Sequence, residues 1–148
     1  MNDPQIYAWI FLSVDETLSS LQDIIAMADG INHAIPSQKE LQTSLGWLSY
    51  HGLVRKEGKK YCHTNTGVEL RRRMSAKTMM KTWDNTTAEL SRITGTADPD
   101  EDVTPRDVSK AYQGYKKRFW QEYRKLREND AQQGGPGYPP QGVGSPDP

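Results

Sequence analysis

The chain has 148 residues, and its 19 basic and 19 acidic side chains give a formal net charge of zero. Hydrophobic residues make up 34% of it, so it has room for one domain with a small core. No apolar run approaches the roughly 20 residues of a membrane-spanning helix. The single cysteine, Cys62, cannot form an internal disulfide, which suits a reducing compartment. We therefore expect a cytoplasmic protein that does not bind a membrane.

Two helices are expected before residue 37. Asp3-Pro4 combines a capping residue with a proline at the first helical position. A second helix enters at Leu18 or Leu21 and ends near Asn32, because Pro36 disfavours a helical conformation in the residue before it. We expect both helices to supply packing residues only.

The clearest helix signal covers residues 37–51. Ser37 is a typical N-cap residue and Glu40 stands at the capping-box spacing, so each side chain can bond to the other residue's backbone N–H. Gly52 ends the helix, because glycine adopts the left-handed conformation without strain. The apolar positions of the helix recur at helical spacing: Leu41, Leu45 and Leu48.

A two-stranded hairpin is predicted over residues 53–64. Leu53-Val54 begins an extended run, Glu57-Gly58-Lys59 supplies the turn, and Tyr61 alternates with polar neighbours on the return strand. Thr64 is a capping residue for a further helix. The fold class expected from these elements is mainly α with a small β-hairpin wing.

The segments Leu48-Ser-Tyr-His-Gly-Leu-Val54 and Thr64-Asn-Thr-Gly67 resemble bacterial winged-helix regulators of the MarR and PadR kind. In those families a leucine followed by three residues and Gly-Leu-Val ends the recognition helix and opens the wing, and Thr-x-x-Gly ends the wing. The resemblance implies a winged helix-turn-helix domain over residues 1–75. It also implies that the helix at 37–51 lies in the DNA major groove and that the wing at 53–64 contacts the backbone.

The basic residues gather on this part of the chain. Residues 37–81 carry ten basic and three acidic side chains, whereas residues 1–36 carry five acidic and no basic ones. Neutralisation of phosphate supplies most non-specific affinity, so this placement favours double-stranded DNA as the partner. The candidate base-reading residues are Gln38, Lys39, Gln42, Thr43 and Trp47. The candidate backbone contacts are Arg55, Lys56, Lys59 and Lys60 on the wing, with Arg71, Arg72 and Arg73 as secondary phosphate contacts.

A second function stays open, namely a winged helix that binds a protein partner without binding DNA. Trp47 is the residue that favours it, because tryptophan is unusual in a groove-binding position and is enriched at protein interfaces. The zero net charge also suits this alternative.

After the wing, residues 65–94 are expected to be helical, with a helical extension over residues 76–96 and an acidic linker over residues 97–103. Thr104-Pro105 then starts an amphipathic helix over residues 104–128. Its apolar face consists of Val108, Tyr112, Tyr115, Phe119, Tyr123 and Leu126.

Two roles are open for this face. The helix docks on its own domain, or it pairs with the same helix of a second subunit; we expect a homodimer with twofold symmetry. Residues 129–148 are rich in Gln, Gly, Pro and Ser and are expected to be disordered.

Catalytic signals are weak along the whole chain. His33, His51 and His63 lack metal-ligand spacing, and no glycine-rich phosphate loop or nucleophile elbow is present. We expect no metal, no cofactor and no enzymatic activity.

Overall fold

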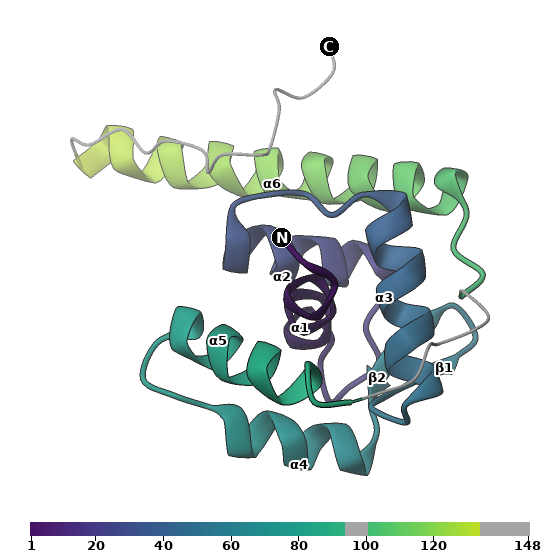
Figure 1. Ribbon diagram of the computed structural model, residues 1–148. Helices are drawn as coiled ribbons and strands as arrows, with labels where there is room; N and C mark the ends of the chain where they lie inside the picture. Colours follow the sequence, from purple (N-terminus) through teal and green to yellow (C-terminus); the bar gives the residue numbers. More distant parts are fainter. Residues whose placement is uncertain (94–100, 134–148) are drawn as a thin grey trace.

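The computed structural model describes residues 1–93 and 101–133, with side chains of the last helix described as far as Asn129 (Figure 1). The described part is mainly helical and has a small antiparallel hairpin, as the sequence predicts. Its helices are α1 (Asp3–Ser13), α2 (Leu21–Asn32), α3 (Gln38–Tyr50), α4 (Asn65–Met74), α5 (Met79–Leu90) and α6 (Pro105–Gln133). Its strands are β1 (Val54–Glu57) and β2 (Lys60–His63).

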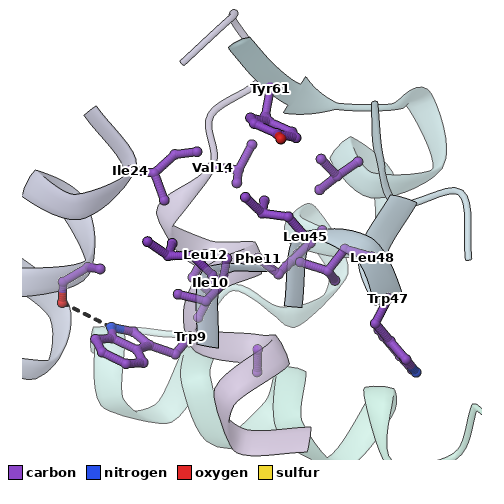
Figure 2. Close-up of a cluster of buried hydrophobic side chains, with 14 of the residues drawn as sticks. Trp9, Ile10, Phe11, Leu12, Val14, Ile24, Leu45, Trp47, Leu48 and Tyr61 are labelled. Carbon is purple, nitrogen blue, oxygen red and sulfur yellow. Dashed lines mark hydrogen bonds between the residues drawn. The ribbon is translucent and has the colours of Figure 1, made fainter. Parts of the chain in front are cut away.

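Helix α1 lies at the centre of the molecule, with α2, α3 and α5 packed around it (Figure 1). Residues 8–13 are all buried, so this part of α1 has no solvent-facing side. Two tryptophans fasten the neighbouring helices to α1. Trp9 donates its indole N–H to the carbonyl of Ala28 in α2 at 2.9 Å (Figure 2). Trp83 of α5 donates to the carbonyl of Gln5 at 2.9 Å.

The predicted capping box of α3 is present. The N–H of Glu40 donates to the Ser37 hydroxyl at 3.1 Å, and the N–H of Ser37 donates to the Glu40 carboxylate at 2.9 Å. At α1 the cap differs from the prediction by one residue. Asn2 caps the helix through a reciprocal pair of bonds with Gln5, and Asp3 is the first helical residue.

The hairpin joins the helical core through a third extended segment. β1 and β2 are antiparallel, with Val54 opposite His63 and a turn at Gly58 that requires a positive φ of 62°. Ser19, between α1 and α2, forms an isolated bridge with Tyr61. The Ser19 N–H donates to the Tyr61 carbonyl at 2.6 Å, and the Tyr61 N–H donates back at 2.9 Å. β2 therefore lies between β1 and the α1–α2 connection.

The Thr64–Gly67 segment fixes the end of the hairpin to the end of α3. The Thr64 hydroxyl donates to the Gly52 carbonyl at 2.6 Å and accepts the Gly67 N–H at 3.0 Å. A Cβ atom at Gly67 would overlap the Leu53 carbonyl. Glycine is needed at Gly67 for this close backbone approach rather than for an unusual φ.

The helix expected over residues 65–94 is two helices, α4 and α5, separated by a turn. Thr78 caps α5 by accepting the N–H of Lys81 at 3.1 Å, and the Thr82 hydroxyl accepts the N–H of Ala76 at 2.9 Å. These side-chain bonds satisfy the backbone where the chain reverses. The turn allows α5 to pack against α1.

Helix α6 is longer than predicted. Residues 129–133 are helical, so the tail expected from residue 129 does not start there; none of these five residues is glycine or proline. Residues 134–148 and most of the expected linker at 97–103 lie outside the described residues.

The first half of α6 packs on α2, which is the intramolecular one of the two predicted roles (Figure 1). Val108 and Tyr115 are buried there, and the Tyr115 hydroxyl donates to the Asp29 carboxylate at 2.7 Å. A Cβ atom at Gly114 would overlap the side chain of Gln22, so α6 approaches α2 closely. Towards the other end of α6, Leu126 is 62% exposed.

Replacement of Gly67 by alanine should destabilise the protein by about 1–3 kcal/mol, because the new methyl group would have to displace the backbone of Leu53. The matched control is Gly30→Ala in α2, where no atom lies within 4 Å of the added methyl group. Gly30→Ala should raise stability by about 0.5–1 kcal/mol, because alanine is the better helix former. Urea unfolding measures both, and equal stability of the two variants would contradict the packing described for Gly67.

Candidate nucleic-acid interface

Helix α3 turns its leucine face to the core, as predicted. Leu41, Leu45 and Leu48 are fully buried, and Figure 2 shows Leu45 and Leu48 within the core. Away from this face, Lys39 is exposed, and Gln38, Gln42 and Thr43 are half-buried. Four of the five predicted base-reading residues therefore retain some solvent contact.

Trp47 does not. It is only 5% exposed, so the prediction that it faces a groove is wrong. Its ring points away from Leu45 and Leu48 (Figure 2) and stacks on Tyr7 of α1, with centroids 4.5 Å apart and planes 12° from parallel. The helical periodicity predicted the leucine face of α3 correctly, but α1 also covers the face that carries Trp47. The large size of tryptophan, which favours burial, was the available signal.

The hairpin keeps its basic tip in solvent. Lys59 and Lys60 are exposed. Arg55 is also exposed and pairs with Glu57 on the same strand at 2.9 Å. An exposed pair of this kind is readily exchanged for a phosphate contact, because it contributes little stability.

A segment near the start of α6 lies against α3. The side-chain amide of Gln38 donates to the Val103 carbonyl at 2.6 Å and to the Gln42 side chain at 3.2 Å. The backbone N–H of Glu101 points to the Gln42 carbonyl at 3.4 Å. Val103 is 2% exposed. The side chain of Gln38 and the backbone of Gln42 are thus already engaged by residues about sixty positions later in the chain.

The same segment brings negative charge to the hairpin. Lys56 pairs with Glu101 at 3.2 Å and lies over the Tyr61 ring at 5.6 Å. Hydrogen bonds from the Thr104 backbone and hydroxyl lower the pKa of Asp107, and the nearby Lys59 and Lys56 lower it further.

Burial raises the pKa of Tyr61, and the carboxylates of Glu101, Asp102 and Asp107 add to that increase. A pocket of about 610 Å³ lies among these groups, lined by Lys56, Lys59, Lys110, Asp102 and Asp107 among others. Both positive and negative side chains line it. The basic surface expected over the wing is therefore interrupted at Lys56.

The arginines of α4 belong to a different surface. Arg71 and Arg72 line a pocket of about 430 Å³ together with Glu16 and Met27, away from α3. Arg71 donates to the Ser75 hydroxyl at 2.7 Å, and Arg72 pairs with Glu69 at 3.0 Å. Arg73 is exposed. The structure does not bring these three residues together with the predicted base-reading positions.

His63 connects β2 to α1. Its Nε2 lies 2.8 Å from the Phe11 carbonyl, which can only accept, so Nε2 carries the proton. The ring stacks on Phe11, with centroids 4.3 Å apart, and Nδ1 is buried without a hydrogen-bond partner among the described residues. Burial lowers the pKa of His63. The ring is therefore a neutral structural group.

Within residues 1–93 and 101–133, no three histidine, cysteine or acidic side chains are grouped so that they could hold a metal ion. In the same part of the chain, no helix is long and apolar enough to cross a membrane.

No protein-family model matches the chain, and no curated protein or solved structure is significantly similar to it.

Acidification should destabilise the protein through His63. The unfolded histidine binds a proton near pH 6.5, whereas the folded one does so only at lower pH. The free energy of unfolding should therefore fall as the pH drops below that value, by at most about 1.4 kcal/mol per pH unit from this residue. Urea unfolding between about pH 7 and pH 5 measures this slope.

His63→Gln should reduce the slope, because it removes the buried imidazole. An equal slope in the wild type and His63→Gln would contradict this assignment.

Proposed function

We propose that the chain is a winged-helix protein that binds double-stranded DNA through α3 and the tip of the hairpin. The observation that carries the proposal is the pair of exposed lysines, Lys59 and Lys60, on a hairpin that directly follows α3, where Lys39 is exposed and other polar residues are half-buried. Phosphate neutralisation by such lysines supplies much of the affinity of DNA-binding proteins.

The order of the elements supports the winged-helix assignment. Two helices precede α3, and the hairpin follows it. Ser19, between the first two helices, bridges to Tyr61 in the second strand of the hairpin, so three extended segments lie side by side. This order agrees with the resemblance in Leu48–Val54 and Thr64–Gly67, because both segments lie at the junctions of α3, the hairpin and α4.

The chemistry of α3 is suitable for base recognition. Its 13 residues span roughly 20 Å, and a helix fits the major groove. Lys39 can donate to guanine, and the amides of Gln38 and Gln42 can pair with adenine. Thr43 is placed one turn after Lys39 and can contact either a base or the backbone.

The second candidate function is a protein-binding module without DNA binding. The Lys56–Glu101 pair favours it, because this pair interrupts the basic surface between the wing and α3. Trp47 does not favour it, since its side chain is buried.

The homodimer also stays a prediction. The first half of α6 is occupied by α2, which leaves the second half, with exposed Leu126, for contact with a second subunit. A cytoplasmic location is likewise a prediction.

Binding of a mixed-sequence duplex should weaken steeply with salt, and Lys59→Glu/Lys60→Glu should flatten that dependence. Each lost phosphate contact reduces the slope of log affinity against log salt by about 0.9. The matched control is Lys77→Glu/Lys81→Glu, which makes the same charge change at the α4–α5 turn, at the other end of the molecule (Figure 1). The control should keep a slope closer to that of the wild type.

Equal slopes for the two double variants would contradict binding at the hairpin tip. The substitution Val103→Ser should loosen the segment that lies over α3. If neither this variant nor the wild type binds DNA at about 50 mM salt, DNA binding is contradicted altogether.

A further inference from the structure

Residues 101–107, called the acidic cover from here on, occupy part of the surface that the proposed DNA complex needs. Val103 lies against α3, and its carbonyl holds the Gln38 side chain at 2.6 Å. Glu101 holds Lys56 at 3.2 Å. The cover therefore engages both halves of the proposed interface, namely the helix and the wing.

The cover presents to the wing the same chemistry as a DNA backbone. Carboxylates and phosphates are both anionic hydrogen-bond acceptors, and lysine binds either. Asp107 adds to this, because Lys59 and Lys56 lie close enough to lower its pKa. Asp102 lines the same pocket as Lys56 and Lys59.

The contacts of the cover suit a reversible association. Lys56 and Glu101 retain 30% and 19% of their side-chain exposure, and ion pairs this close to solvent contribute little stability. The other contacts are one buried valine, the Gln38–Val103 hydrogen bond and a longer backbone contact from the Glu101 N–H to the Gln42 carbonyl at 3.4 Å. The last three residues of the cover form the start of α6, and beyond them α6 is anchored separately through the Tyr115–Asp29 bond. The cover can thus leave α3 while α6 remains on α2.

We propose that the acidic cover is an intramolecular competitor of DNA: bound to α3 and Lys56 it blocks the interface, and DNA binds only when it is displaced. The inference rests on the proposed DNA binding. The apparent dissociation constant then rises in inverse proportion to the uncovered fraction of the protein. Any change that loosens the cover should strengthen binding without adding a contact to DNA.

The first test uses a substitution that changes no charge. Val103→Ser removes the buried side chain of the cover and leaves α3 and the hairpin intact. It should bind a mixed-sequence duplex about three- to tenfold more tightly than the wild type. The matched control is Val68→Ser, a half-buried valine in α4, which should leave the affinity unchanged.

The second test separates the cover from general electrostatics. Glu101→Gln/Asp102→Asn and Glu122→Gln/Glu128→Gln remove the same number of negative charges, the second pair from exposed positions on α6. Both raise the net charge equally, so a general effect would strengthen binding equally. Competition by the cover instead predicts a clearly larger gain in DNA affinity for Glu101→Gln/Asp102→Asn.

Hydrogen exchange on the full chain reports displacement of the cover directly. On addition of duplex DNA, the backbone amides of residues 101–104 should exchange faster, while those of α3 and the hairpin exchange more slowly. Slower exchange in all three segments would overturn the inference, because the cover would then be part of the DNA interface.

The outcomes separate the two proposals. Tighter binding by Val103→Ser than by the wild type supports both DNA binding and the competition. The case in which Val103→Ser binds and the wild type does not is included. Equal binding by wild type and Val103→Ser overturns the cover and retains DNA binding. If neither protein binds, DNA binding is overturned, and the competition with it.

Discussion

Complete burial of the second half of α1 is the constraint on which the rest of the structure depends. Residues 8–13 have no solvent face, so helices must pack around them on all sides. Trp9 is bonded to α2, and Trp83 bonds α5 to the start of α1. The leucine face of α3 closes another side. This packing leaves Lys39, Gln42 and Thr43 of α3 outside the leucine face and in contact with solvent.

The sequence predicts best where the signal is local. Ser37 and Glu40 lie three residues apart and bond to each other, so their spacing alone predicts the start of α3. The hairpin follows from its glycine turn and flanking apolar residues. Gly67 marks a close backbone approach, whereas the Thr-x-x-Gly pattern indicated only the end of the wing. The complete burial of the second half of α1 could not be predicted in this way, because an unbroken apolar run does not say how many neighbours surround it.

The sequence predicts least where segments distant along the chain are in contact. Those contacts determine which side chains of the candidate interface are accessible. Trp47 is placed correctly on α3, but only the position of Tyr7 shows that it is covered. Gln38 and Val103 are 65 residues apart, and no local pattern connects them. The same holds for Lys56 and Glu101. The basic wing predicted from the sequence is therefore present as a hairpin, while part of its charge is neutralised within the chain. DNA binding by this protein would thus depend on an internal competition as well as on the basic residues themselves.

The most direct test of DNA binding by α3 and the hairpin is a titration of the isotope-labelled full chain with a short mixed-sequence duplex, followed by backbone amide shifts in solution at low salt. The account predicts that the largest shifts lie in three places: around Lys39 and Thr43, at the hairpin tip around Lys59, and in the released segment around Val103. Shifts confined to α4 or to the second half of α6 would contradict it, because the DNA would then bind a surface that α3 and the hairpin do not form.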